Sequence, residues 1–260
     1  MSLQSALITL NRLESRGGGI SVDCRFQITV LAVYLVAVLS VPLTDPGMLV
    51  WMFVYPIVMS EACGAGYGRV ALKSLWVLPL VALVGIFNPL LDHAPAWEIF
   101  GVTVSRGWVT FISICLRGIL ALQAVLALIY STGFYSICTA LRRMGMPTVL
   151  ATQLLMVYRY ISVLLQEAQS MGRARAARGF GRKNYPLRQW AIMVGQLLLR
   201  SVARSQRIHR AMLARGFNGT MPAPAAERLR VSDWLFLIGW LGVTAVLRFV
   251  DLSSLLGNLL

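Results

Sequence analysis

Five stretches of this chain are apolar for long enough to cross a lipid bilayer as helices. They lie near residues 26–43, 47–60 with its flanks, 72–91, 107–131 and 232–250. A helix needs about 20 apolar residues to span the hydrocarbon layer. The pattern therefore predicts five transmembrane helices. Pro56, Pro79 and Pro89 lie within the second and third stretches and predict kinks there.

A sixth apolar stretch, Thr148–Gln166, has a different pattern. Its polar positions recur at helical spacing and form one stripe: Thr148, Thr152, Arg159, Ser162 and Gln166. We expect a long amphipathic helix that ends at Gly179. A second helix is expected between Pro186 and Gly216, antiparallel to the first helix or crossed over it.

Basic residues indicate which connections face the cytoplasm. Arg12, Arg16 and Arg25 precede the first apolar stretch, and eleven Lys or Arg residues with no Asp or Glu lie between 168 and 226. Cytoplasmic loops of membrane proteins are enriched in Lys and Arg. We therefore expect the N-terminus and this basic block inside and the C-terminus outside. If Thr148–Gln166 crossed the bilayer, the block would lie outside, so we expect that it does not cross.

The composition favours the same class of protein. A mean hydropathy of +0.70 and 57% hydrophobic residues are typical of an integral membrane protein, and the net charge of +14 belongs to its loops rather than to a nucleic-acid surface. We expect an all-α, polytopic protein of a bacterial cytoplasmic membrane, with two long cytoplasmic helices. Residues 1–131 would hold the N-terminal transmembrane helices, 132–230 the cytoplasmic region and 231–260 the last transmembrane helix.

An eight-residue repeat stands out within the basic block. Residues 173–180 read RARAARGF and residues 210–217 read RAMLARGF, so that six of eight positions match 37 residues apart. Gly179 and Gly216 suit the left-handed position just past a helix end, and Phe180 and Phe217 would fold back over the last turn as in a Schellman cap. The repeat therefore predicts two helix ends of the same kind.

Each copy places arginines beside small residues at its helix end. The matching positions are Arg173 and Arg210, Ala177 and Ala214, and Arg178 and Arg215. A guanidinium group is a rigid fork that favours a carboxylate, and alanines leave room for another protein. We interpret Arg178 and Arg215 as docking residues. Neutralisation of the helix end, worth about 0.3–1 kcal/mol, and adhesion to anionic lipid stay open as simpler explanations of the charge.

The sequence shows no motif for chemistry of its own. It contains no G-x-x-x-x-G-K-[ST] nucleotide site, and His93 and His209 have no partner at metal-ligand spacing. We therefore expect no enzyme activity and no cofactor in this chain, so that any ATP is hydrolysed by another subunit. The alternative is a membrane enzyme that holds a phosphorylated lipid among the arginines of the repeat, although the block has no acids to hold a metal.

The paired Ala-Arg-Gly, at 177–179 and 214–216, resembles the signature of the transmembrane T component of energy-coupling factor (ECF) transporters. Met146-Pro147 and the segment LLMVYRYI at 154–161 are similar to the cobalt and nickel branch of that family. The resemblance is strongest between about 134 and 220. Before residue 130 it consists only of a series of apolar spans.

This resemblance implies a role in energy coupling. The two helices would each seat one arginine in a groove of one of two ABC-type ATPases, which would hold the ATP and Mg. The residues that carry over are Ala177, Arg178, Gly179, Ala214, Arg215 and Gly216. A separate membrane subunit would capture the substrate. The branch implies cobalt or nickel as that substrate, with biotin or another vitamin as the alternative.

Overall fold

The computed structural model describes residues 22–43, 46–64, 66–91, 95–99, 102–179, 187–219 and 229–249. Long apolar helices dominate these residues, and the prediction of an all-α polytopic membrane protein is confirmed. By packing, the chain divides into two compact units. We call the unit that contains 22–137 and 229–249 the membrane unit, and the unit that contains 138–219 the α9–α10 unit. The predicted division at 131 and 230 concerns the bilayer and stays a prediction.

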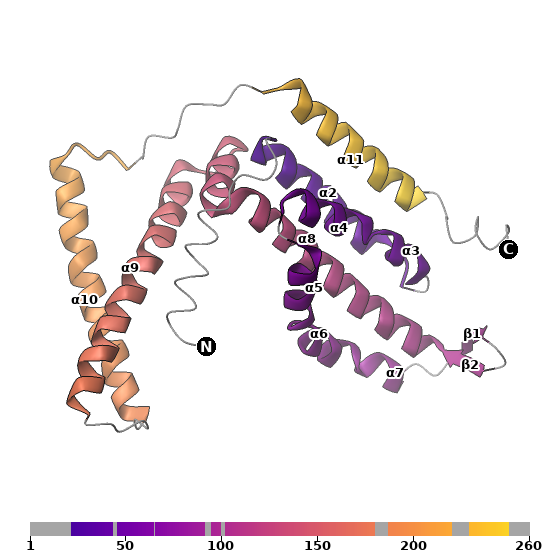
Figure 1. Ribbon diagram of the computed structural model, residues 1–260, viewed down its shortest axis with the longest axis horizontal. Coiled ribbons are helices and arrows are strands. Elements are labelled where there is room, and N and C mark those ends of the chain that lie inside the picture. Colours follow the sequence, from indigo (N-terminus) through magenta and orange to yellow (C-terminus); the bar gives the residue numbers. More distant parts are fainter. Residues whose placement is uncertain are drawn as a thin grey trace. The chain divides into compact units, whose positions relative to one another are not determined.

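The helices of the membrane unit follow the apolar stretches of the sequence. They are α2 (Cys24–Ser40), α3 (Pro46–Trp51), α4 (Val54–Ala62), α5 (Tyr67–Leu75), α6 (Leu78–Gly85), α7 (Phe87–Leu91), the first part of α8 (Arg106–Arg143) and α11 (Val231–Phe249) (Figure 1). A short antiparallel β-hairpin of β1 (Pro95–Ile99) and β2 (Val102–Ser105) precedes α8. The sequence had indicated only a connection there.

The second and third apolar stretches are broken into short helices, and the expected kink near Pro79 is confirmed, whereas kinks at Pro56 and Pro89 stay predictions. Pro56 is the third residue of α4, Pro79 the second of α6 and Pro89 the third of α7. Proline is tolerated in the first turn of a helix, where its missing N–H group has no helical acceptor in any case. Each of these three helices therefore starts anew just before its proline. The axis bends by 46° between Tyr67–Leu75 and Leu78–Leu90.

Three helices within the described ranges are long and apolar enough to cross a membrane: α8, α9 (Thr148–Arg178) and α11. The bent run from α5 to α7 makes a fourth if it counts as one span, and α2 and the run from α3 to α4 are apolar but shorter. Length and composition thus allow α9 to cross as well. Both the count of five spans and the placement of α9 outside the bilayer stay predictions.

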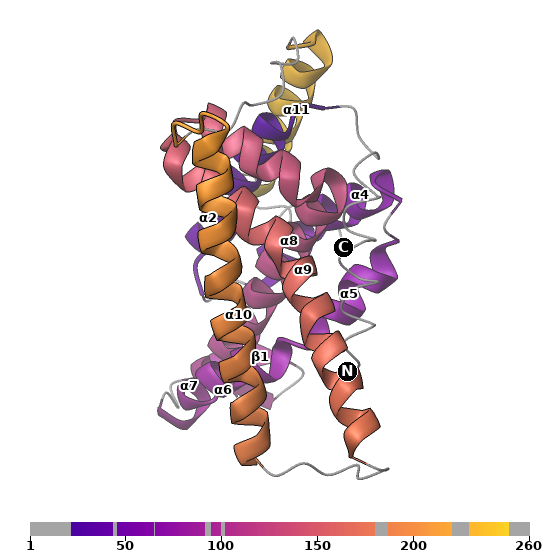
Figure 2. The same ribbon diagram turned by 90° about the vertical axis from the view of Figure 1, so that its left-hand side faces the viewer.

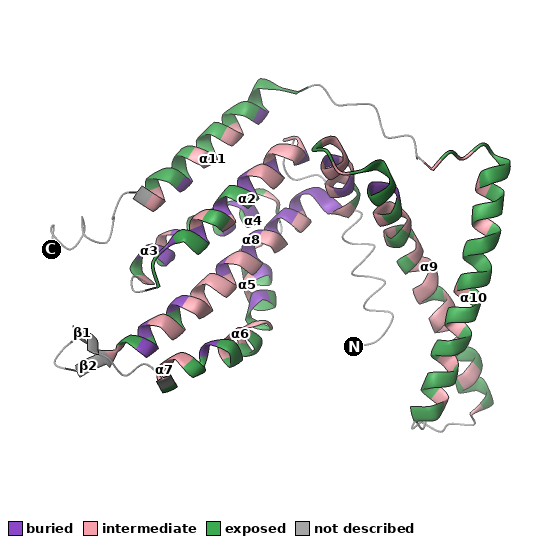
Figure 3. Cartoon of the chain, turned by 180° about the vertical axis from the view of Figure 1, so that it is seen from behind, coloured by how far each residue is buried: buried purple, intermediate pink, exposed green. Residues whose placement is uncertain are grey.

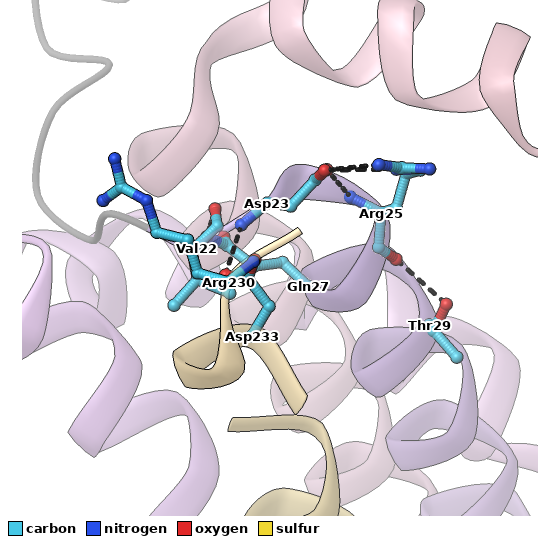
Figure 4. Close-up of polar contacts among 7 residues, drawn as sticks. All are labelled: Val22, Asp23, Arg25, Gln27, Thr29, Arg230 and Asp233. Atoms are coloured by element: carbon cyan, nitrogen blue, oxygen red, sulfur yellow. Dashed lines mark hydrogen bonds and ion pairs between the residues drawn. The ribbon is translucent and has the colours of Figure 1, made fainter. Parts of the chain in front are cut away.

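Helices α2 and α11 lie side by side and run in the same direction, although about 210 residues separate them (Figure 1). At their starts, the backbone N–H of Asp23 donates to Asp233 Oδ1 over 3.2 Å (Figure 4). At their ends, Arg248 Nη2 donates to the carbonyl oxygen of Ser40 over 3.0 Å. Because the two starts meet and the two ends meet, both helices begin on the same side of the unit.

The same start is reinforced by two acidic caps. Asp23 is the N-cap of α2: its Oδ1 accepts from the N–H of Arg25 over 3.1 Å, and its Oδ2 pairs with Arg25 Nη2 at 2.7 Å. Asp233 is buried in the first turn of α11, where its Oδ2 accepts from the N–H of Arg230 over 2.8 Å (Figure 4). A carboxylate at a helix start satisfies free N–H groups and offsets the positive helix end.

Helix α8 runs antiparallel to α2. Near its start, Ser113 Oγ donates to the carbonyl oxygen of Leu43, just past the end of α2, over 2.8 Å. Farther along, Ser131 Oγ donates over 2.7 Å to Oε1 of Gln27, in the first turn of α2. The run from α5 to α7 is antiparallel to α8 in turn, since Gln123 contacts Ser74 and the start of α8 packs on Gly85. Helix α2 and the run from α5 to α7 therefore point in one direction, and α8 points in the other.

Aromatic residues fill the centre of the membrane unit. Tyr34 of α2 stacks on Tyr55 of α4 with ring centroids 4.4 Å apart, and Trp240 of α11 meets the ring of Tyr55 edge-on at 4.8 Å. The hydroxyl of Tyr34 donates to the carbonyl oxygen of Met52 over 2.9 Å. That carbonyl lies at the break between α3 and α4, where the helix leaves acceptors free. The core thus holds the broken helix in place.

Helix α8 is itself two helical pieces. Gly133 interrupts it with φ 72° and ψ 156°, a conformation that side chains other than glycine rarely adopt. The predicted fourth span, 107–131, ends just before this break. From Cys138 onward the chain belongs to the α9–α10 unit, which contains the end of α8, α9 and α10 (Leu187–Ala214).

Candidate functional site

The two copies of the repeat form the ends of two long helices. Helix α9 ends at Arg178 with Gly179 as its C-cap, and α10 ends at Ala214, directly before Arg215 and Gly216. The expected long helices and their end points are therefore confirmed. Of the repeat residues, only Phe180 lies outside the described part of the chain.

At the second copy, the predicted cap geometry is confirmed. Gly216 has φ 79°, and its N–H group donates to the carbonyl oxygen of Leu213 over 3.0 Å. The N–H group of Phe217 reaches back to the carbonyl oxygen of Met212, also over 3.0 Å. These two bonds define a Schellman motif, which satisfies carbonyls that the helix end leaves without a partner.

At the first copy, the predicted left-handed glycine is wrong. Gly179 has φ −86° and ψ 0°, and its N–H group donates to the carbonyl oxygen of Ala176 over 3.2 Å. Any residue adopts this right-handed conformation, so the backbone of the cap does not require a glycine here. Glycine permits a left-handed cap without imposing one, and the rest of the chain decides which cap forms.

Helices α9 and α10 lie next to each other and run in opposite directions (Figures 1 and 2). Near the end of α9, Arg175 donates to the backbone oxygen of Gln189 over 3.0 Å and also contacts Gln189 Oε1. Farther up, Arg200 Nη1 pairs with Glu167 Oε1 at 2.6 Å. Because residues late in α9 meet residues early in α10, the two helices are antiparallel, as expected.

The antiparallel arrangement places the two arginine ends far apart. The end of α9 lies beside the start of α10, so Arg178 and Arg215 are separated by roughly the length of α10. Its 28 residues correspond to about 42 Å at 1.5 Å per residue. One phosphate therefore cannot be surrounded by the four repeat arginines, and the alternative of a lipid-modifying enzyme loses the site on which it depended.

The residues at both ends are open to solvent. The exposed members of the two copies include Arg173, Ala177, Arg178, Arg210, Ala214, Arg215 and Gly216. The four arginines at the two matched positions take no part in the ion pairs Asp23–Arg25 and Glu167–Arg200. Each guanidinium group is thus presented outward beside a small alanine side chain, as a docking contact requires.

Sequence reasoning missed the contact that ties the two helices together near the first end. Arg175 occupies the third position of the repeat, where the second copy has Met212. In the structure, this unmatched arginine holds the start of α10, and Met212 supplies the carbonyl that closes the Schellman motif. The available signal was that Arg175 is one of the two positions at which the copies differ, and the only one of the two that carries a charge.

The surface of the α9–α10 unit is basic. No Asp or Glu lies between 168 and 226, and Glu167, immediately before this block, is paired with Arg200. Among the described residues of the whole chain, no group of three or more His, Cys, Asp or Glu side chains lies close enough to hold a metal ion. The geometry therefore suits binding of acidic partners by two separated contacts.

Comparison with known proteins identifies the family. The family model of the cobalt transport protein CbiQ matches residues 22–224, which include both helix ends and most of the membrane unit. The chain belongs to the CbiQ family. This CbiQ-family chain is accordingly an integral membrane protein that forms a component of a transport system.

Three relatives show how far the likeness extends. The chain is 29% identical over 138 residues to the cobalt transport protein CbiQ of Salmonella typhimurium and 33% identical over 96 residues to that of Rhodobacter capsulatus. It is also 25% identical over 149 residues to an uncharacterized protein of Methanocaldococcus jannaschii. These matches cover 48%, 35% and 56% of this CbiQ-family chain, and 61%, 39% and 51% of the relatives.

Proposed function

We propose that this protein is the transmembrane coupling subunit of an ECF-type ABC importer. The observation that carries the proposal is the pair of exposed arginine ends, Arg178 and Arg215, at opposite ends of one antiparallel helix pair. Two equal contacts about 42 Å apart suit two equal partners rather than one small ligand. Membership of a cobalt transport family supports this choice.

The two partners would be ABC-type ATPases, each of which receives one helix end in a groove. A guanidinium group seated against a carboxylate forms two parallel hydrogen bonds. Removal of one side chain from such a buried pair lowers the binding free energy by about 2–5 kcal/mol. This chain has no phosphate-binding loop, so the ATP and Mg would be held by the ATPases. The chain would then transmit force and carry out no chemistry of its own.

The mechanism follows from the stiffness of the helices. When the ATPases close on ATP, their two grooves change separation, and the ends anchored in them must follow. Helix α9 has 31 residues and α10 has 28, and the contacts Arg175–Gln189 and Glu167–Arg200 connect them. A change in the distance between the ends therefore turns one helix against the other. A separate membrane subunit that captures the substrate would receive this motion.

The directions of the membrane helices support a cytoplasmic α9–α10 unit. Because α2 and α11 are parallel and α8 is antiparallel to α2, α8 ends on the side where α11 begins, so the chain between them makes an even number of crossings. Helix α10 is not among the described helices that are long and apolar enough to cross a membrane. An even number of crossings therefore favours an α9 that stays outside the bilayer. With Arg142 and Arg143 at the inner end of α8, the N-terminus lies inside and the C-terminus outside.

The substrate is proposed from the family. The family model and two of the relatives are named for cobalt transport, so we propose cobalt or nickel ions as the cargo. Binding would occur on the capture subunit, because the described residues of this chain form no metal-ligand cluster. Identification of the membrane subunit that co-purifies with this chain distinguishes a metal ion from biotin or another vitamin.

The docking role is tested by the double substitution Arg178→Ala and Arg215→Ala. Assembly with the ATPases in mild detergent should be lost, and transport with it. The matched control is Arg159→Ala with Arg188→Ala, which removes two exposed charges of the same unit away from the helix ends. Intact co-purification and transport in the double variant would refute the docking role. Loss of assembly in the control variant alone would assign the docking role to Arg159 and Arg188 instead.

The topology is tested separately by cysteine labelling. A single cysteine at position 183, in a chain whose four native cysteines are replaced, should react only with reagents that reach the cytoplasm. Labelling of this position from outside would show that α9 crosses the bilayer, and it would remove the helix ends from the side where ATP is available.

A further inference from the structure

A groove of about 320 Å³ lies between the middle of α9 and the middle of α10. Helix α9 contributes Leu164 and Glu167 to its walls, and α10 contributes Leu197, Arg200, Arg204 and Arg207. The three arginines are four and three residues apart, so they project from one face of α10 toward the same space. The groove therefore combines a row of positive charges with leucine side chains.

The charges in the groove do not balance. Glu167 is the acid among the lining residues, and its Oε1 lies 2.6 Å from Arg200 Nη1. Arg204 and Arg207 take no part in this ion pair or in the pair Asp23–Arg25. Two guanidinium groups thus line a concave surface and lack an anionic partner within the described chain. An anion that accepts hydrogen bonds from both would complete the site.

We propose that this groove binds the phosphate group of an anionic phospholipid headgroup. Basic pockets between helices on the cytoplasmic side of membrane proteins recognise such headgroups, and leucines beside the arginines suit the start of the acyl chains. The apolar wall of the groove continues along α9, since Val157 and Ile161 are exposed and lie seven and three residues before Leu164, on the same face of the helix. An acidic protein segment would match the charge but would not explain these exposed apolar side chains.

The groove is distinct from the two helix ends. Arg204 precedes Arg215 by eleven residues, or about 16 Å along α10, and the end of α9 lies farther away on the other side. A headgroup bound there would leave both docking arginines free. The lipid site can therefore exist whether or not the ends dock into ATPases, and it would hold the middle of the helix pair at the membrane surface.

Native mass spectrometry of the full chain in detergent tests the site. Dioleoylphosphatidylglycerol should bind in preference to dioleoylphosphatidylcholine, which has the same acyl chains and a neutral headgroup. Arg204→Gln with Arg207→Gln should weaken binding of the anionic lipid about 25-fold, at about fivefold for each basic residue near the phosphate. The control, Arg159→Gln with Arg188→Gln, removes the same charge outside the groove and should leave binding within about twofold.

A second variant should strengthen binding of the anionic lipid instead of weakening it. Glu167→Gln removes the acid that neutralises Arg200, so it should strengthen binding of the anionic lipid about fivefold. A general loss of structure cannot produce a gain. Raised salt should weaken binding to the unchanged protein, because these side chains are partly exposed.

Three results would overturn the proposal. Equal loss of lipid in the groove variant and in the control would mean nonspecific adhesion to a basic surface. Binding of inorganic phosphate as tight as that of the phospholipid would assign the groove to a free anion. Capture of an acidic soluble protein, together with no preference for the anionic lipid, would assign it to a protein partner.

Discussion

The membrane unit and the α9–α10 unit use the same kinds of residue in opposite ways. In the membrane unit, buried polar side chains bond to other helices, as Ser131 does to Gln27 and Tyr34 to Met52. In the α9–α10 unit, α10 has no buried residue along its 28 residues (Figure 3). A helix that buries little within its own chain depends on something outside the chain. The first unit thus buries its polar contacts within the chain, whereas the second leaves α10 exposed, as our proposal of a surface for partners requires.

The largest expected difference between the two units concerns core packing. Leu49 is fully buried, so Leu49→Ala should lower the free energy of unfolding in detergent by about 2–5 kcal/mol, because it leaves a cavity. Leu199 of α10 is 72% exposed, and Leu199→Ala should change the same quantity by less than about 0.5 kcal/mol. Thermal unfolding of both variants measures this. Equal destabilisation would mean that α10 packs within the chain after all.

The next effect tests whether the exposed ends bind by shape as well as by charge. Arg178→Lys and Arg215→Lys keep the charge but lose the planar fork, and each should weaken assembly with the ATPases by about 1.5–3 kcal/mol. Stability of the isolated chain should not change. Pull-down titration measures the assembly, with Arg188→Lys as the matched control. If the lysine variants assemble fully, the planar fork is not needed, and the arginines would serve only to neutralise the negative charge of the helix ends.

A smaller effect separates the two helix ends from each other. Gly216 has a positive φ and open space around it, so Gly216→Ala should cost about 1–2 kcal/mol through backbone strain alone. Gly179 has a right-handed backbone, so Gly179→Ala should be neutral or slightly stabilising for the isolated chain. Unfolding monitored by circular dichroism compares the two.

The same pair of variants also probes docking. If Gly179 is present because a partner approaches closely, Gly179→Ala should reduce assembly although it leaves the fold unchanged. Normal assembly of Gly179→Ala would show that neither the backbone nor the partner requires glycine at this end.

The smallest expected effect concerns the ion pair between α9 and α10. The side chains of Arg200 and Glu167 are 62% and 32% exposed, so Arg200→Gln should cost only about 0.2–1 kcal/mol at low salt and less at high salt. Unfolding at two salt concentrations measures the difference. A large loss that does not depend on salt would mean that this contact holds the helix pair together more firmly than an exposed pair normally does.

Several elements were predictable from local sequence because their cause is local. The apolar stretches became helices, and prolines at 56, 79 and 89 marked the first turns after breaks. The repeat predicted where α9 and α10 end. The β-hairpin before α8 and the helix break at Gly133 were not foreseen, because short strands and a single glycine carry weak signals within apolar sequence.

The candidate site was predictable in its residues but not in its geometry. The repeated Arg-Gly ends could be read from the sequence, whereas the Arg175–Gln189 contact and the basic groove could not. Those features depend on which residues of the two helices face each other. The periodicity of a sequence shows which residues share one face of a helix, but it does not show where a neighbouring helix lies along that face.

The sequence by itself determined the membrane class, the helical content and the two matched helix ends, because hydrophobicity, charge and helix-stop residues act over one or two turns. Only the tertiary structure decided that α2 and α11 run in parallel and that the two arginine ends point apart. It also decided that Gly179 and Gly216 take different conformations despite equal surroundings in sequence. The directions of the helices follow from contacts between segments far apart in the chain, where packing and not local preference selects the arrangement.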